Sequence, residues 1–336
     1  MMKHFWKWGM VCRFLGCLYI EGFWDRSLKA ARVQVLSLYT VYSAACLTGV
    51  VAYEMGVVVV NIFLLPDVAG SFAKSLLLIV YAVVLIKIIV NVLCMTLGSS
   101  KLLQFLREAE AYEKATSFGY SAGSEACRRN WRTQARRWVS AAALVASYGM
   151  AMTIYMRNFM QGYDDPWHNF LKVLGFFSEF YLFFFDSVAY IVLGSTVDVL
   201  VEYLKSLVES LGTCEKNRLL LCSRLCPRTV EDIRHNFSRI QALIHCINDI
   251  WHPAITATSA CLVWILCTTL YTVFDDGFTT LDIWLSVTYA VYASVGFFDL
   301  AVKSQELGDQ AQKMKNATKS VRRCAVSEEY IQQVGD

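Results

Sequence analysis

The stretch from Thr229 to Phe274 constrains the fold most strongly, because it joins a water-soluble helical pattern to an apolar one. Its first part places apolar side chains at alternating spacings of four and three, which form one stripe along a helix. The sequence turns apolar after Pro253, a residue that can seed or kink the next helical turn. We therefore expect one helix that stands half in lipid and half in a packed, water-exposed collar. The stripe consists of Ile233, Phe237, Ile240, Ile244, Ile247 and Trp251.

Long apolar runs recur along the rest of the 336-residue chain, of which 56% is hydrophobic and only 18% is charged. A soluble domain of this size would carry more charge, and the runs approach the roughly 20 residues that cross a bilayer core. Short alternating segments, the pattern of a transmembrane β-barrel, are absent. We predict an all-α polytopic membrane protein with six transmembrane helices. The spans are expected near residues 33–53, 76–97, 138–160 and 170–193, then in the apolar part that ends at Phe274, and near 283–302.

The predicted spans divide the chain into five parts. A basic, aromatic segment at the N-terminus is expected to lie in the membrane interface as an amphipathic helix. A long polar loop is expected over residues 98–137, and the C-terminal tail reads as partly helical, because Leu307, Ala311, Met314 and Val321 continue an apolar stripe. The parts are 1–32 (N-terminal segment), 33–204 (helices one to four), 205–250 (loop and anchor helix), 251–302 (helices five and six) and 303–336 (tail).

The distribution of basic residues predicts the orientation. Nearly all of the 31 lysines and arginines fall in the N-terminal segment, the two long connections and the tail. Lys74, Arg157 and Lys172 border the opposite side, where the short turns are acidic. The positive-inside rule therefore places both termini and both long connections in the cytoplasm. No cysteine falls in the segments placed outside, so no extracellular disulfide is predicted.

Two charged residues lie near the middle of predicted spans. Lys87 lies in the middle of the second span, and Asp186 lies just past the middle of the fourth. An unpaired charge in a bilayer core costs about 2.5–3.5 kcal/mol even on lenient scales, so both are expected to face the bundle interior. They either pair with each other or contact a polar ligand, or each meets a different internal partner.

Aromatic residues with polar tips surround these charges in the predicted outer halves of the spans. Such side chains around one or two charges suit a small-molecule pocket that opens outward. The alternative is that they serve packing or form an interfacial belt. The candidate ligand-binding residues are Lys87, Tyr148, Glu179, Tyr181, Asp186, Trp264, Tyr271, Trp284 and Tyr289.

The motifs of enzymes and nucleic-acid-binding proteins are missing. The sequence has no paired-carboxylate signature, no phosphate-binding glycine loop and no histidine pair on one helical face. Cys222, Cys226 and His235 have a loose metal-like spacing, which we interpret as reduced thiols rather than a metal site. The net charge of +3 is too small to indicate a nucleic-acid partner. No catalytic activity, cofactor or metal is predicted.

Several short segments together resemble the arthropod gustatory receptors of the insect chemoreceptor superfamily. Phe14-Leu15-Gly16 lies in the basic N-terminal segment, and Ile247-Asn248-Asp249-Ile250-Trp251 leads into a span that ends in Leu270-Tyr271. The last span continues as Ser304-Gln305-Glu306-Leu307. Long inner loops, very short outer loops and an inside N-terminus complete the resemblance.

This resemblance implies a plasma-membrane ligand-gated cation channel subunit that binds a small-molecule tastant among its helices. It also implies contact with membrane lipid and a homo- or hetero-tetramer with other receptor subunits. The family has seven spans, and its seventh carries Thr-Tyr, five apolar residues and Gln-Phe. Here Thr288-Tyr289 is followed by Val295-Gly296 at the Gln-Phe position and lies in the sixth span. We therefore expect the chain to lack the seventh, pore-lining span.

Two other functions remain open at this point. A six-span solute transporter would use Lys87 and Asp186 as coupling or substrate groups, although the halves show no convincing internal repeat. A chain without the seventh span could instead be a non-conducting receptor fragment. Ligand-evoked current would favour the receptor channel, and solute uptake without current would favour the transporter.

Overall fold

The chain folds mainly into long helices. The computed structural model describes residues 9, 11–14, 16–18, 20–21, 28–33, 37–63, 72–116, 118, 131–160, 166–221, 227–274 and 278–334. Strands β1 (Ile20–Glu21) and β2 (Arg32–Val33) form an antiparallel pair in which Ile20 lies opposite Val33. The helices in the described part are α2 (Leu38–Phe63), α4 (Phe72–Leu97), α5 (Ser99–Thr116), α7 (Trp131–Met160), α8 (Pro166–Leu221), α9 (Pro227–Phe274) and α10 (Thr280–Val334).

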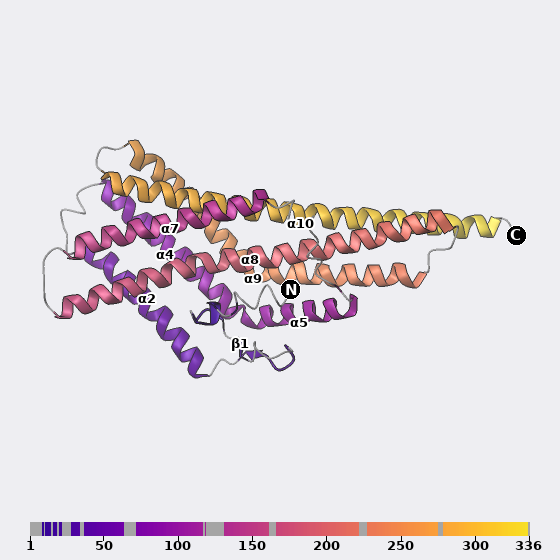
Figure 1. The fold of residues 1–336 in the computed structure, drawn as a ribbon, viewed down its shortest axis with the longest axis horizontal. Coiled ribbons are helices and arrows are strands. Elements are labelled where there is room, and N and C mark those ends of the chain that lie inside the picture. Colours follow the sequence, from indigo (N-terminus) through magenta and orange to yellow (C-terminus); the bar gives the residue numbers. More distant parts are fainter. Residues whose placement is uncertain are drawn as a thin grey trace.

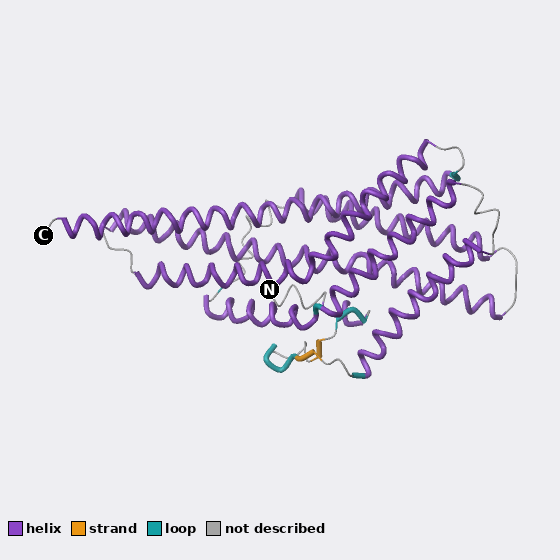
Figure 2. Tube along the Cα trace, turned by 180° about the vertical axis from the view of Figure 1, so that it is seen from behind, coloured by secondary structure: helices purple, strands orange, loops and turns teal. Residues whose placement is uncertain are grey.

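The helices align along one long axis (Figure 1). At one end, which we call the bundle end, α2, α4 and α7 pack with the first halves of α8 and α10 and the last part of α9. At the other, the collar end, α5 and the first part of α9 lie beside the long second halves of α8 and α10 (Figure 1). The view from behind shows the same division (Figure 2). Helices α8 and α10 therefore extend through both ends of the molecule.

Each of the six predicted spans overlaps one of these helices, and several helices extend well beyond the span. Within the described residues, α4, α8, α9 and α10 each contain a stretch long and apolar enough to cross a membrane. Helices α2 and α7 have 26 and 30 residues, which exceeds the roughly 20 needed for a crossing. The predicted start of the first span at Val33 is wrong, because Arg32–Val33 is a strand and α2 begins at Leu38.

The prediction of a long polar loop over residues 98–137 is also wrong in part. Residues Ser99–Thr116 form the amphipathic helix α5, and Trp131 already begins α7. Helix α5 buries Leu102, Phe105 and Leu106. Phe105 and Leu106 lie three and four residues after Leu102, which places all three on one face of the helix. Charged residues between them hid this apolar face within a segment that is polar on average.

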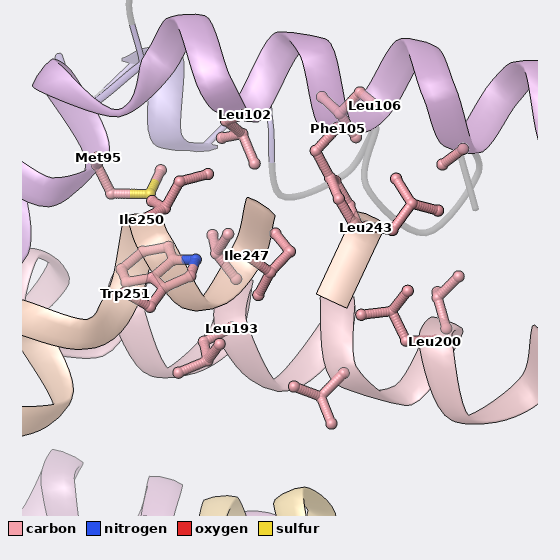
Figure 3. Close-up of a cluster of buried hydrophobic side chains, with 14 of the residues drawn as sticks. Met95, Leu102, Phe105, Leu106, Leu193, Leu200, Leu243, Ile247, Ile250 and Trp251 are labelled. Carbon is pink, nitrogen blue, oxygen red and sulfur yellow. The ribbon is translucent and has the colours of Figure 1, made fainter. Parts of the chain in front are cut away.

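The collar is held together by an apolar core around α9. Figure 3 shows Ile247, Ile250 and Trp251 of α9 lying between Met95 and Leu102 on one side and Leu193 on the other. Trp251 and Ile240 are fully buried, and Ile233 and Ile247 are buried as well. Phe237 and Ile244 are partly buried and pack against the same core. The stripe thus faces α8 and also α5, a helix that the sequence analysis did not predict.

Helix α9 runs without a break from the collar into the bundle. Pro253 lies inside it and does not end it. Among the described residues, large exposed apolar side chains follow on this helix only after that point, from Ile255 through Leu270 to Phe274. The change from a polar to an apolar surface therefore coincides with the proline, which is the division that the sequence predicted.

The described part of the N-terminal segment packs onto the protein. Cys12, Cys17 and Leu18 are buried in the main core. The hydroxyl of Tyr42 on α2 donates a 2.9 Å hydrogen bond to the carbonyl of Phe14. Gly16 has φ +75°, and a Cβ there would lie 3.1 Å from the backbone of Ser43, so only glycine fits comfortably. Residues 11–14 are helical and Phe14 is 73% exposed, so the interfacial amphipathic helix stays a prediction.

Candidate functional site

Lys87 and Asp186, the charged residues near the middle of two spans, form an ion pair inside the bundle. Lys87 on α4 places its Nζ 2.5 Å from Oδ1 of Asp186 on α8, and both side chains are almost completely buried. The surrounding spans are apolar, so each charge neutralises the other where water cannot. Of the partners considered from the sequence, the structure therefore shows the direct pair.

Two tyrosines of α10 complete this pair. The Lys87 amine donates a 3.0 Å hydrogen bond to the hydroxyl of Tyr289, which donates a 2.8 Å bond to Oδ2 of Asp186. Tyr292 points its hydroxyl at the Asp186 carbonyl, 3.4 Å away. The Lys87 nitrogen also lies 5.4 Å from the ring centre of Tyr289 and 5.9 Å from that of Tyr292, within the range of a cation–π interaction. We call Lys87, Asp186, Tyr289 and Tyr292 the interior site.

Tyr148 and Tyr181, two of the other predicted ligand-binding residues, lie elsewhere in the same core. The ring of Tyr148 on α7 meets that of Phe183 edge to face, with centres 4.9 Å apart. Tyr181 points toward α2, where its hydroxyl lies 3.1 Å from that of Tyr42. Tyr148 lies close enough to Asp186 for an electrostatic interaction, whereas the contacts of Tyr181 are directed at α2.

The remaining predicted residues are dispersed. Trp264 and Trp284 are 46% and 58% exposed, so their side chains face the surface of the single chain and do not join the interior site. Tyr271 lies near the end of α9, with its ring 6.1 Å from that of Phe278. Glu179 is half-buried on α8. Their aromatic character alone could not distinguish a residue that lines a cavity from one that faces lipid.

Glu54 is a buried charged residue that the sequence analysis missed. It lies on α2, is 1% exposed, and accepts a 2.5 Å hydrogen bond from Ser178 on α8. The first span was expected to end at Tyr53, and this early end removed Glu54 from the search for charges inside spans. A lone acidic residue within an apolar helix is the signal that would have identified it.

A second group of charges lies farther along the same helices, toward the collar. Asp299 on α10 is completely buried and accepts hydrogen bonds from Arg136 on α7, at 3.0 Å, and from Tyr190 on α8, at 2.9 Å. Lys303, one turn farther on α10, lies 3.4 Å from the same carboxylate. Three helices therefore converge on one buried carboxylate.

The other carboxylate of this group belongs to α8. Asp198 lies 3.2 Å from the Lys303 amine and also pairs with Arg137 of α7. Lys303 is 4% exposed and reaches the carbonyl of Gly194 at 3.4 Å. We call this group, formed by Arg136, Arg137, Tyr190, Asp198, Asp299 and Lys303, the junction cluster. Sequence reasoning missed it because the last span was expected to end at Val302, which places Asp299 near its edge and Lys303 outside it.

The described residues offer no group of three or more His, Cys, Asp or Glu side chains that could hold a metal ion. Cys222 and Cys226, which have the loose metal-like spacing, lie outside the described residues. The chemistry of the interior site is therefore that of a buried cation, a buried anion and phenolic hydroxyls. Such a site can bind and orient a small polar molecule by exchange of hydrogen bonds.

The chain was compared with curated proteins and with models of protein families. No individually curated protein matches the chain significantly. The family model of the 7tm chemosensory receptors matches residues 10–334, nearly the whole chain. This is not a family of enzymes. The match also agrees with a polytopic helical membrane protein. The chain therefore belongs to the 7tm chemosensory receptor family and is a membrane chemoreceptor.

Proposed function

We propose that this chain is a gustatory-receptor-like subunit of a ligand-gated cation channel, and that a small-molecule tastant binds among its membrane helices. The observation that carries the proposal is the interior site, where Lys87 and Asp186 form a buried ion pair with Tyr289. A chemoreceptor needs a polar, specific contact inside an otherwise apolar bundle. A ligand with its own hydrogen-bonding groups can replace Tyr289 or one charge as a partner.

The position of this site favours ligand sensing over a purely structural role. Its four residues come from α4, α8 and α10, so a molecule bound there contacts three helices at once. Both members of the ion pair are nearly inaccessible in this state. A ligand that reaches them must move at least one helix, and binding energy that depends on such a movement can shift a conformational equilibrium.

The orientation and assembly belong to the same proposal. The basic residues support a cytoplasmic N-terminus, tail and collar at the plasma membrane. The family resemblance supports a homo- or hetero-tetramer in contact with membrane lipid, with conduction supplied by the assembled channel. The collar core around Trp251 then supports the helices that enter the membrane.

Electrical recording tests the proposed function. We would express the chain alone and with candidate partner receptors, then apply sugars, amino acids, bitter amines and carboxylic acids while measuring cation current. The expected result is a ligand-evoked current. Asp186→Asn should abolish this current or raise the ligand concentration that is needed to evoke it. The exposed Trp264→Phe variant is the control and should keep the response.

Two results would contradict this function. Solute uptake without current would identify a transporter that uses Lys87 and Asp186 as coupling groups. Surface expression with neither current nor uptake, alone or with partners, would identify a non-conducting receptor fragment. Radiolabelled uptake and surface biotinylation in the same cells distinguish these results.

A further inference from the structure

The interior site and the junction cluster lie on matching faces of the same two helices. On α8, Asp186, Tyr190, Gly194 and Asp198 follow one another at intervals of four residues, which places them along one face. On α10, the residues that meet them are spaced three or four apart. These are Tyr289, Tyr292, Gly296, Asp299 and Lys303.

These two faces contact each other level by level. Tyr289 and Tyr292 meet Asp186 at the first level. Tyr190 meets Asp299 at the next, and its ring also lies against Gly296. At the third level Lys303 meets Gly194 and Asp198.

The contacts continue into the collar, where Lys205 of α8 lies 2.8 Å from Glu306 of α10. We call this series of contacts the α8–α10 ladder. It runs without interruption from the buried ion pair to the collar.

The ladder fixes the position of α10 along α8. Hydrogen bonds and ion pairs weaken steeply when their atoms separate by an ångström, and buried partners have no water to replace them. Both helices are continuous over these levels. A displacement of α10 therefore disturbs all levels together, and packed contacts of this kind have discrete arrangements rather than a continuous range.

Lys303 is the member of the ladder that depends most on this position. Its amine is shared among Asp198, Asp299 and the Gly194 carbonyl. A Cβ added at Gly194 would lie 3.1 Å from that amine. A side chain at residue 194 would therefore crowd this amine, and the end of the lysine would have to shift by a few tenths of an ångström.

We propose that the α8–α10 ladder couples the interior site to the collar. A change at Lys87, Asp186 or Tyr289 moves α10 against α8 and releases Lys303. The part of α10 beyond Lys303 then becomes less firmly held. The coupling rests on the proposed function only in taking a bound ligand as the natural trigger.

Hydrogen–deuterium exchange tests the coupling without any ligand. The full chain is placed in phosphatidylcholine nanodiscs, and exchange is followed in the peptides of α10 that cover residues 304–318. Asp186→Asn should accelerate exchange there by about fivefold or more, the lower end of typical coupling between sites. Lys303→Met should act at the same place, because it removes the amine that Asp198 and Asp299 share. Lys319→Met, at an exposed lysine on the same helix just beyond these peptides, is the matched control and should have little effect.

The double variant decides the question. If the ladder transmits the change, Asp186→Asn adds less than about twofold once Lys303→Met is present, because the contacts of the Lys303 amine are already lost. The proposal is overturned if Asp186→Asn leaves the exchange of residues 304–318 unchanged, or if the two effects multiply. Should Asp186→Asn fail to fold, Tyr289→Phe serves as the trigger with the same expectations. A missing ligand response would count against the proposed function and not against the ladder.

Discussion

The hydroxyl of Tyr289 donates a 2.8 Å hydrogen bond to Asp186, although 103 residues separate the two in the chain. The same hydroxyl accepts a hydrogen bond from Lys87, so the phenol lies between the two members of an ion pair. A third helix is therefore attached to a contact that two helices already share. This arrangement places the most polar point of the bundle where α4, α8 and α10 meet.

The ion pair should behave as one unit in mutagenesis. We expect Lys87→Met and Asp186→Asn each to lower the free energy of unfolding by about 3–5 kcal/mol, because each leaves a buried group without its partner. The double variant should lose much less than the sum of the two. Thermal unfolding in detergent and surface expression are the measurements. Full additivity would show that the two charges do not depend on each other.

Removal of one hydroxyl should separate the roles of the two tyrosines. Tyr289→Phe deletes a group that bonds both charges, and we expect a loss of about 1–3 kcal/mol. Tyr292→Phe removes only a 3.4 Å contact with a backbone carbonyl and should cost less. Both changes keep the aromatic ring, so packing is matched between them. An equal loss in the two variants would argue against a special role for Tyr289.

The collar core should be sensitive to lost volume. Ile240 is fully buried, and Ile240→Ala should lower the free energy of unfolding by about 2–5 kcal/mol. Ile255 on the same helix is 38% exposed, so Ile255→Ala is a matched change with an expected cost below about 1 kcal/mol. Chemical unfolding in detergent followed by circular dichroism would compare them. Similar costs would mean that the collar is not a packed core in solution.

The predicted sidedness can be tested by glycosylation. Asn236-Phe237-Ser238 and Asn316-Ala317-Thr318 are acceptor triplets that should stay unmodified, because basic residues hold their segments in the cytoplasm. A long Gly/Ser loop with an acceptor triplet, inserted between Asp275 and Asp276, should instead receive a glycan. Mobility on gels before and after endoglycosidase treatment is the readout. Sugar at either natural triplet would reverse the orientation.

Cys12 should resist alkylation. Burial raises the pKa of its thiol from 9.0 to about 12, so its thiolate fraction near neutral pH falls about 1,000-fold. Mass spectrometry after N-ethylmaleimide treatment should show slow modification of Cys12 relative to the half-exposed Cys246. Equal labelling of the two in the folded chain would contradict the packing of the N-terminal segment.

The raised pKa of Cys12 also predicts a pH dependence. The unfolded chain loses this proton near pH 9.0 and the folded chain keeps it to about pH 12. The stability that comes from the neutral thiol is therefore full below pH 9 and declines as the pH rises between these values. Replacement of Cys12 by alanine should make unfolding less sensitive to pH in this range. Parallel pH profiles for the two proteins would contradict the shift.

The sequence predicted the helical spans well because lipid imposes a simple requirement. Any segment that crosses the hydrocarbon core must be apolar and must satisfy its own backbone hydrogen bonds. The stripe from Ile233 to Trp251 could also be recognised, because helical geometry fixes its spacing. Helix α5 was missed because polar and charged residues dominate any average over residues 98–137, although one face of the helix is apolar.

The site was predicted less completely for a different reason. Lys87 and Asp186 stood out because a charge inside a span is costly and therefore needs a partner. The sequence could not choose among partners, since the choice depends on which helices become neighbours. Asp299 and Lys303 were missed because they lie at the edge of a span, where a charge needs no special explanation.

The amino-acid sequence by itself determined the class of protein, because apolar length and the placement of basic residues are properties of single segments. It also determined which face of the collar helix is buried. The tertiary structure alone decided that α8 and α10 lie side by side in matching register, with Tyr289, Asp299 and Lys303 of α10 directed at α8. That decision depends on contacts between residues about 100 positions apart, and the periodicity of one helix carries no information about its neighbour.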